Sequence, residues 1–200
     1  MGNKTGKGKK LMMAGAVLVG AALLLLLHNL YEDYLAGQAS GLLLPDVQAA
    51  IGDQNQGLGR FPGDDMTVRE IDGHDYIGYL SLPALGLELP VMSSWDEERL
   101  KIAPCRHFGS TWNDNLVIAG HNYKRHFGTL SKLEKGDAVF FTDMEGVENT
   151  YKVEEIILVR PTAADELKNS DWDLILYTCT YGGQDRVAVC CARSPVISEL

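Results

Sequence analysis

The sequence lacks the features that define several common protein classes. It has four cysteines but no CxxC pair and no CxxC…HxxxH spacing, so a structural zinc site is not expected. Internal repeats and low-complexity blocks are also missing. A chain of 200 residues with 46% hydrophobic content suffices for one medium domain and an appendage.

Basic side chains are scarce beyond the N-terminus. Lys4, Lys7, Lys9 and Lys10 precede the first acidic residue, Glu32, and the remaining 14 of 18 basic residues face all 27 acidic ones. A polypeptide with this acidic excess repels phosphate backbones. Nucleic acid is therefore not an expected partner.

One long hydrophobic run is present, residues 11–31, without a formal charge. As a helix it is about 30 Å long, the thickness of a bilayer's hydrocarbon core. No polar face interrupts it, which disfavours a buried soluble helix. A signal peptide cleaved within 35–40 is the alternative, but that segment lies well past the run. We predict a cytoplasmic tail (1–10), an uncleaved transmembrane anchor (11–31) and an extracellular remainder, because the lysines precede the run.

The extracellular part is predicted to contain a tether and one domain. Residues 32–75 are rich in Gly, Gln and Asp and indicate a tether, with a short helix favoured at 45–51. From residue 76 to 200, short β-branched stretches alternate with turn signals, which is typical of an all-β barrel or sandwich. The predicted strands are residues 76–82, 87–92, 115–121, 137–142, 150–159, 173–180 and 186–192. Helical pattern is confined to residues 93–103, capped by Ser93 or Ser94, and 161–167.

The four cysteines differ in what their surroundings allow. Cys190 and Cys191 are neighbours in a predicted strand and point to opposite faces, so they are expected to pack as small apolar side chains. Cys105 lies in a predicted loop and is assigned no function. Cys179 ends an apolar strand just before a turn, a partly exposed but rigid position that suits a nucleophile. A thiol also needs a basic or cationic partner.

His121 is the candidate partner of Cys179. It follows an apolar strand, and the preceding Gly120 leaves space for another backbone or a substrate to approach. A solvated loop histidine is the alternative. Among the other histidines, His74 is predicted to lie in the tether and His126 in a loop, whereas His107 is kept as a competing candidate.

Arg186 is the third candidate, seven residues after Cys179. The intervening pair Gly182 and Gly183 predicts a tight reversal, so that Arg186 returns beside Cys179. A guanidinium stays charged and donates hydrogen bonds in a fixed fork, so it can stabilise the oxyanion that forms when a thiolate attacks a carbonyl. Arg193 lies roughly 23 Å farther along the strand and is expected to be a surface charge.

The combination of "IAGHN", "LYTC" and an arginine opening the next strand resembles the sortase family of cell-surface cysteine transpeptidases. The family's TLxTC-type motif is matched by Leu176, Thr178 and Cys179, with Ile175 where Thr is usual. The stretches "CRHFGSTW" and "FGTLSKLEKGDAVFF" resemble the family's segments before and after the histidine. The resemblance covers residues 76–193 and implies an eight-stranded sortase β-barrel with short helices behind the N-terminal transmembrane helix.

The resemblance also implies a reaction. Cys179 would attack the Thr carbonyl of an LPxTG-type C-terminal sorting signal on a secreted protein, and His121 would serve as general acid and then base. Arg186 would position the substrate and stabilise the oxyanion. An amine from a peptidoglycan precursor or from a lysine of a pilin-type surface protein would resolve the thioacyl-enzyme. An extracellular domain anchored in the cell membrane agrees with where such substrates are found.

Three residues are further candidates for substrate binding. Thr178 and Tyr181 flank the nucleophile, with strand packing as an equal alternative, and the resemblance gives His107 a structural or pocket-lining role. Neither a metal nor a cofactor is expected. Acidic residues cluster at 143–148; a solvated loop explains them more simply than calcium binding, although modulation by calcium stays open.

The spacing of the motifs bears on the class. Only 58 positions separate His121 from Cys179, which favours class D, then class A, over class B with its long insertion. The short stretch after Arg193 has no membrane helix of the kind that many pilin-polymerising class C enzymes carry. The competing functions are a thiol peptidase that hydrolyses the same signal and a non-catalytic, anchored surface-binding barrel. An L,D-transpeptidase is disfavoured because an SHGC-like motif is absent.

Overall fold

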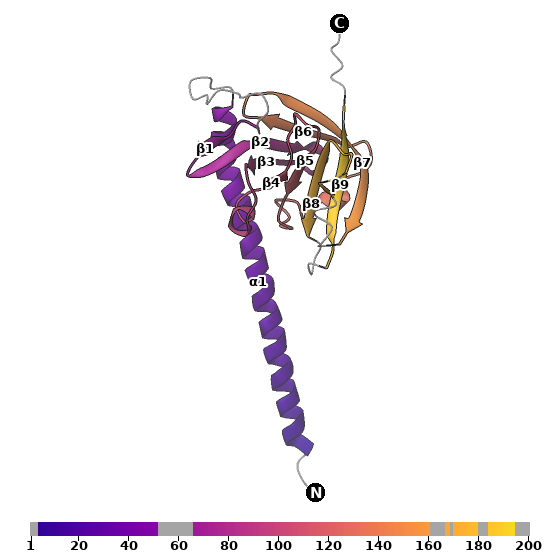
Figure 1. Ribbon diagram of the computed structural model, residues 1–200. Helices are drawn as coiled ribbons and strands as arrows, with labels where there is room; N and C mark the ends of the chain where they lie inside the picture. The colour runs from indigo at the N-terminus through magenta and orange to yellow at the C-terminus, as the bar shows by residue number, and fades with distance from the viewer. Residues whose placement is uncertain (1–3, 52–65, 161–166, 169, 180–183, 195–200) are drawn as a thin grey trace. The chain divides into compact units, whose positions relative to one another are not determined.

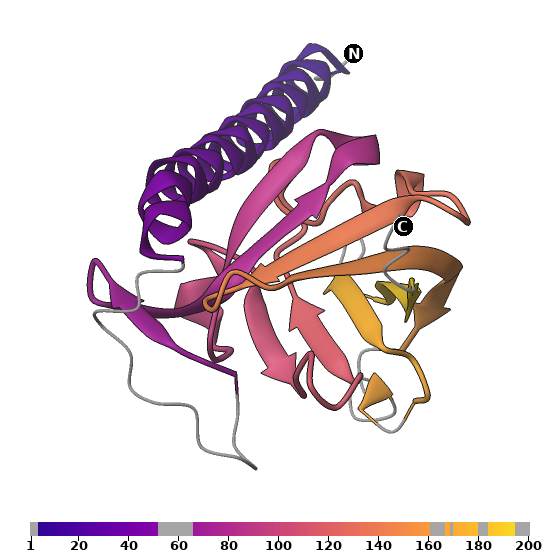
Figure 2. The same cartoon turned by 90° about the horizontal axis from the view of Figure 1, so that it is seen from above.

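The computed structural model describes residues 4–51, 66–160, 167–168, 170–179 and 184–194 (Figures 1 and 2). The chain divides into two compact units, Met1–Leu35 and Ala36–Leu200. Helix α1 (Lys4–Ala50) supplies the described part of the first unit and continues into the second. Its N-terminal part is long and apolar enough to cross a membrane, and the large apolar side chains between Leu11 and Leu27 are exposed.

The second unit contains a closed β-barrel. Within the described residues, its strands are β1 (Arg69–Ile71), β2 (His74–Leu82), β3 (Leu87–Met92), β4 (Cys105–Phe108), β5 (Leu116–Ala119), β6 (Ala138–Asp143), β7 (Glu148–Val159), β8 (Leu174–Cys179) and β9 (Arg186–Arg193). They are ordered β1-β2-β3-β4-β5-β8-β9-β7-β6, and β2 also pairs with β6. Eight strands therefore close the barrel, and β1 extends it beside the first part of β2. The predicted all-β barrel is confirmed.

Two strands were missed by the sequence prediction. Strand β1 has only three residues and falls in the segment predicted to be a tether. Strand β4 was predicted to be a loop, and Cys105 with it, because the four residues "CRHF" are too few to display a period of alternation. In the structure Cys105 is fully buried and pairs with Ala119.

The segment before the barrel differs from the predicted tether in the residues that the structure describes. Residues 36–50 belong to α1, which passes through Pro45, and they form part of the barrel's unit. Val47 is fully buried against a small cluster that includes Met92, Cys105 and Met144. The apolar residues around Leu43 and Val47 give this turn of helix a face that packs on the barrel. The tether prediction was therefore wrong for 36–50 and, because β1 and the start of β2 lie there, for 69–75.

The connections contain short helices: α2 (Glu97–Leu100), η2 (Pro83–Leu85) and η3 (Leu130–Lys132). Helix α2 was predicted, but its N-cap is Asp96, whose carboxylate accepts a hydrogen bond of 2.8 Å from the Arg99 backbone N–H. Asp96 replaces the predicted serine cap because it directly precedes the acidic first turn. The helix predicted at 161–167 lies almost entirely outside the described residues.

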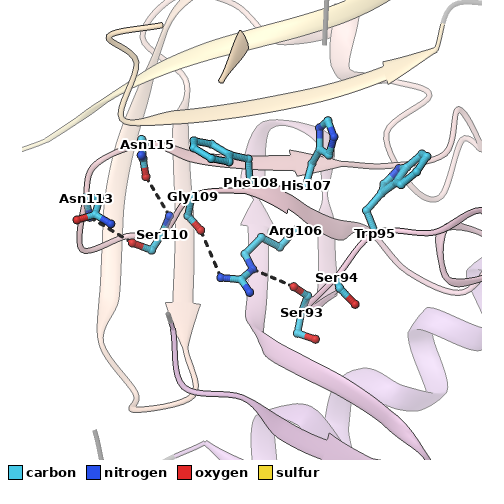
Figure 3. Close-up of a pocket in the computed structure, with 10 residues that line it drawn as sticks. All are labelled: Ser93, Ser94, Trp95, Arg106, His107, Phe108, Gly109, Ser110, Asn113 and Asn115. Atoms are coloured by element: carbon cyan, nitrogen blue, oxygen red, sulfur yellow. Dashed lines mark hydrogen bonds between the residues drawn. The ribbon is translucent and has the colours of Figure 1, made fainter. Parts of the chain in front are cut away.

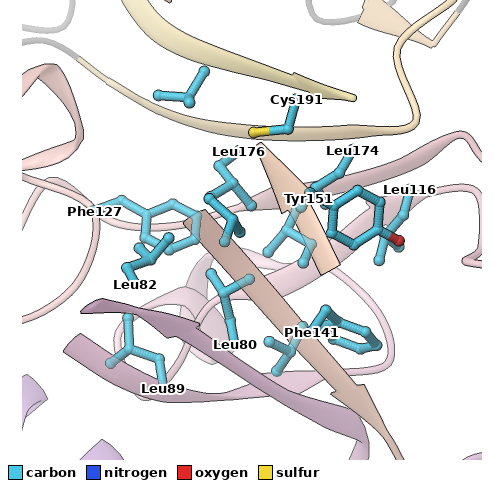
Figure 4. Packing of buried hydrophobic residues seen from close by; sticks show 14 of the residues in the cluster. Leu80, Leu82, Leu89, Leu116, Phe127, Phe141, Tyr151, Leu174, Leu176 and Cys191 are labelled. Carbon is cyan, nitrogen blue, oxygen red and sulfur yellow. The ribbon is translucent and has the colours of Figure 1, made fainter. Parts of the chain in front are cut away.

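The barrel interior fixes which residues of β8 face outward. Leu174 and Leu176 belong to the main core (Figure 4), whereas Ile175 and Tyr177 belong to a second cluster. Since successive side chains of a strand alternate between faces, Cys179 shares the outer face of the barrel with Tyr177. The candidate nucleophile therefore lies on the outer surface, at the end of a strand that packs the core.

Candidate active site

Cys179 is the one exposed cysteine of the four, all of which lie in the described residues and are free thiols. Cys105, Cys190 and Cys191 are fully buried, as predicted for the last two. Burial raises the pKa of the Cys105 thiol to about 12 and that of Cys190 to about 11, and it also raises the pKa of Cys191. Thiol reactivity at neutral pH is therefore confined to Cys179.

Arg186 faces Cys179 across the hairpin. Strands β8 and β9 are antiparallel, and their register places Arg186 directly opposite Cys179. Side chains in such a pair share one face, with Cβ atoms about 5 Å apart. The predicted return of Arg186 is confirmed, although the predicted turn at Gly182 and Gly183, and Tyr181 with it, lie outside the described residues.

His121 approaches the same strand end from the other side. Strands β5 and β8 are parallel, with Ala119 paired to Tyr177, and the Gly120 N–H extends this ladder by donating to the Tyr177 carbonyl at 3.0 Å. His121 follows Ala119 by two positions, as Cys179 follows Tyr177. His121 and Cys179 each lie two residues beyond the last pair of this ladder, at the same end of the two parallel strands. Cys179 thus has Arg186 opposite it on β9, and His121 follows the neighbouring β5 at the same end of the sheet.

Gly120 is required for a reason that the sequence did not reveal. A Cβ atom at this position would lie 2.4 Å from the Phe127 ring, which is fully buried. The space beside Gly120 is therefore filled by Phe127 and not by a substrate. Close packing at this glycine fixes the backbone that carries His121.

Arg186 is held by an aromatic neighbour on the same face. Its Cζ atom lies 5.3 Å from the centre of the Tyr177 ring, within cation–π range, and its Nε has no hydrogen-bond partner among the described residues. Burial raises the pKa of Tyr177 to about 12, against a lowering by the positive charge of Arg186. Tyr177 is therefore protonated at neutral pH and can act as a hydrogen-bond donor.

His107 joins this arrangement from β4. Its Nδ1 lies 2.9 Å from the Tyr177 hydroxyl, and its ring lies 5.8 Å from that of Trp95. The order β4-β5-β8-β9 lets His107 reach over β5 to Tyr177, which in turn contacts Arg186. The structure thus connects His107 to the arginine beside Cys179 through a single tyrosine.

His107 also lines a pocket of about 710 Å³ (Figure 3). Trp95 and Phe108 contribute large apolar surfaces, exposed by 44% and 38%. Arg106 turns away from His107 and donates from Nε to the Ser93 carbonyl at 2.8 Å. The other lining residues are Ser94, Gly109, Ser110, Asn113 and Asn115. An open pocket with aromatic walls and polar groups therefore lies one side chain away from Tyr177.

A model of the sortase domain matches residues 80–194, more than half of the chain. The chain belongs to the sortase family. It is 31% identical over 115 residues to sortase A of Bacillus anthracis, with 54% of each protein covered. The chain therefore spans about half the length of this curated relative.

Solved sortase structures have the same fold. Sortase C1 of Streptococcus agalactiae is 29% identical, covers 63% of this chain and 71% of its own, and has a TM-score of 0.54. Sortase C of Clostridium perfringens, solved with the C-terminal cell wall sorting motif, is 24% identical, covers 76% and 90%, and has a TM-score of 0.55. At 24% identity the second likeness concerns the fold alone. The predicted sortase-type barrel is confirmed.

In this sortase, Thr178 does not lie in a substrate pocket, and Arg193 does not lie on an open surface. Thr178 is only 3% exposed on the face of β8 opposite to Cys179, which favours strand packing over substrate binding. Arg193 was predicted to be a surface charge, but it donates hydrogen bonds to Asp114, to Asn149 and to the Thr111 carbonyl. It is a structural link between the end of β9 and the neighbouring loops.

The acidic cluster of the sortase at 143–148 has a local explanation. One Asp143 oxygen accepts hydrogen bonds from the backbone N–H groups of Glu145 and Val147, at 3.0 and 2.9 Å. This is a side-chain cap of the turn between β6 and β7. Among the described residues, no group of three or more His, Cys, Asp or Glu is arranged to hold a metal ion.

Sequence reasoning missed three residues around the site. Tyr177 could have been found, because alternation along β8 places it on the face of Cys179. Tyr123, whose ring stacks on that of His121, and the buried His126 gave no signal in the sequence. Their positions depend on how the loop after β5 folds back.

Proposed function

We propose that this sortase is a cysteine transpeptidase with Cys179 as nucleophile, His121 as general acid and base, and Arg186 as oxyanion donor. The observation that carries the proposal is the register at the end of β8. The one exposed thiol of the chain is opposed by Arg186, and His121 follows the end of β5 as Cys179 follows the last residue of β8 that pairs with it. A nucleophile, a proton carrier and a cation on one rigid edge are the parts that acyl transfer needs.

The reaction begins when the Cys179 thiolate attacks the scissile carbonyl. The carbonyl oxygen becomes an oxyanion, which Arg186 stabilises through its guanidinium N–H donors. As the C–N bond breaks, His121 gives its proton to the departing amine, and a thioester remains on Cys179. The neutral imidazole then takes a proton from the incoming amine as it attacks the thioester. A new amide is released with the thiolate restored.

The proposed substrate is an LPxTG-type sorting signal near the C-terminus of a secreted protein. Two observations support this choice: the shared fold with sortase C of C. perfringens, which was solved with the C-terminal cell wall sorting motif, and the pocket beside His107. Trp95 and Phe108 offer apolar surface for the signal's Leu and Pro, and His107 links the pocket to Tyr177. We further propose that Tyr181, which follows the nucleophile closely in the sequence, contributes to substrate binding.

The acceptor and the location follow from the same proposal. The exposed apolar part of α1 is suited to a membrane span, and the basic tail before it favours a cytoplasmic N-terminus. The barrel would then lie outside the cell, beside peptidoglycan precursors and pilin-type surface proteins. We propose an amine of one of these as the acceptor, with no cofactor required.

The test is a ligation assay with the full chain in detergent micelles. An LPxTG peptide and an amine-bearing peptide are mixed with the protein, and the products are identified by mass spectrometry. The expected result is an amine-dependent ligated product that is lost in Cys179→Ala and retained in Cys105→Ala. Hydrolysis alone, unaffected by the amine, would favour a thiol peptidase. Ligation by Cys179→Ala, or no covalent labelling of Cys179 by a thiol-reactive sorting-signal analogue, would overturn the proposal.

A further inference from the structure

His126 is a buried histidine that binds the C-terminal part of α1. Its side chain has no exposed surface, and its Nε2 lies 2.8 Å from Ser40 Oγ and 3.3 Å from the Ala36 carbonyl oxygen. The Ser40 hydroxyl donates its own hydrogen to the Ile102 carbonyl at 2.6 Å. Ser40 Oγ is therefore the acceptor toward His126, and Nε2 of His126 carries the hydrogen.

Tyr123 lies between His126 and His121. Its ring stacks on that of His121 with centroids 3.9 Å apart and planes inclined by 9°. The centroids of the Tyr123 and His126 rings lie 5.7 Å apart, and the ring planes are inclined by 65°. Tyr123 thus contacts both histidine rings, and the farther of them from His121, that of His126, is hydrogen-bonded to the helix.

Backbone hydrogen bonds connect the residues of this loop, 121–128, that carry the three rings. The N–H groups of His126 and Gly128 both donate to the Tyr123 carbonyl, at 3.0 and 2.9 Å, and the Phe127 N–H donates to the His121 carbonyl at 3.1 Å. Gly128 leaves no room for a side chain, because a Cβ would lie 2.3 Å from the Asn122 carbonyl oxygen. These bonds close the loop, so a displacement of His126 is expected to move Tyr123 and His121 as well.

We propose that Ser40 and His126 are positioning residues for His121. The Ser40 hydroxyl fixes the His126 ring, His126 holds Tyr123, and Tyr123 sets the plane of the His121 imidazole. The proposal rests on His121 being the proton carrier. It gives Ser40, in the C-terminal part of α1, a role in positioning the proton carrier.

A merely structural role would give a different result, and α1 supplies the control. Val47 lies on the same helical segment and is also fully buried, but it packs against the cluster of Met92 and Cys105. Val47→Ala weakens the docking of the segment without touching His126. Ser40→Ala removes one hydrogen-bond acceptor and leaves the helix face intact.

The first experiment measures kcat and KM for ligation by the full chain in micelles, well below each variant's unfolding temperature. Ser40→Ala is expected to lower kcat about tenfold with little change in KM, because misplacement of a proton carrier slows chemistry and not binding. Ser40→Thr keeps the hydroxyl and is expected to stay near the wild type. Val47→Ala is expected to keep kcat within twofold. A kcat for Ser40→Ala within twofold of the wild type, or an equal loss in Val47→Ala, would overturn the proposal.

Variants of His126 provide a second, chemical test. Gln places an N–H near the position of Nε2, so His126→Gln is expected to keep a larger kcat than His126→Leu. In combination, Ser40→Ala is expected to cost little more once His126→Leu is present, since both act through one contact. Full additivity of the two losses would contradict the proposal.

A third measurement does not depend on ligation. The imidazole NMR signals of His121, assigned by their loss in His121→Gln, are expected to shift in Ser40→Ala and to stay unchanged in Val47→Ala. Unshifted signals would overturn the positioning role even if the chain proved inactive. A wild-type protein that makes no ligated product while these signals do shift would instead refute the proposed transpeptidase.

Discussion

Cys179, the last residue of β8, and Arg186, the first residue of β9, are directly opposed across the hairpin. The pair is set by strand register, not by long flexible loops, so the thiol and the guanidinium keep one geometry while the core stays packed. The ring of Tyr177, two residues earlier on the same face, makes a cation–π contact with the guanidinium. Ordinary barrel packing thereby preorganises a site on the barrel's surface.

Selective alkylation of Cys179 is the first prediction. At pH 8 the buried thiols stay protonated, because their pKa values are raised, to about 12 for Cys105 and about 11 for Cys190. Only the thiolate reacts with iodoacetamide, and only Cys179 is exposed. Intact-mass spectrometry of the native protein should therefore show a single adduct, lost in Cys179→Ala. A second adduct that forms at the same rate would contradict the burial of the other three.

Alkaline destabilisation is the second prediction. The folded pKa of Cys105, about 12, lies above the ordinary value of 9.0. Between these values the unfolded chain loses this proton while the folded chain keeps it, so the free energy of unfolding falls as the pH rises from about 9 to 12. Urea titrations at pH 8 and 10.5 should show a lower midpoint at the higher pH. In Cys105→Ala the drop should be smaller, and an undiminished drop would exclude Cys105 as a contributor.

The third prediction is that substitution of Arg186 lowers activity, whereas substitution of Arg193 lowers stability. Arg186→Ala removes the proposed oxyanion donor and should lower kcat about 100-fold or more. Arg186→Lys should keep only part of the wild-type kcat, because lysine lacks the planar pair of N–H donors of the guanidinium. Arg193 instead binds Asp114, Asn149 and the Thr111 carbonyl. Arg193→Ala should cost about 2 kcal/mol in unfolding free energy with kcat nearly unchanged. Ligation kinetics and denaturant titrations of both variants decide the point.

Much of this site could be predicted from the sequence, whereas contacts between distant parts of the chain could not. The opposition of Cys179 and Arg186 follows from alternation along strands and a short reversal, which are local properties. The buried His126 and the docked segment 36–50 depend instead on contacts between residues far apart, such as Ser40 with His126. Strands β1 and β4 were missed because three or four residues are too few to display a period.

Tyr177→Phe is the fourth prediction, a test of the link between the pocket and the arginine. The phenyl ring keeps the cation–π contact with Arg186 but loses the hydroxyl's hydrogen bond to His107. One neutral hydrogen bond is worth about 1 kcal/mol, so kcat/KM should fall about fivefold. His107→Ala should give a similar loss, and the double variant should be little worse than either. Independent, multiplying losses would show that His107 does not act through Tyr177.

The last prediction concerns where the folded domain begins. The sequence places the boundary at residue 76, whereas the structure includes residues 36–50 in the barrel's unit. Val47 is fully buried against Met92, Cys105 and Met144, so removing the helix exposes this cluster to water. Burial of one large aliphatic side chain contributes about 2 kcal/mol, and Leu43 and Ile51 pack there too.

A chain of residues 36–200 should therefore unfold at nearly the temperature of the full protein, measured by circular dichroism. A chain of residues 76–200, which also lacks β1, should unfold at least 5 °C lower and bind a hydrophobic dye at rest. Equal unfolding temperatures for the two shortened chains would show that the segment adds nothing to the barrel.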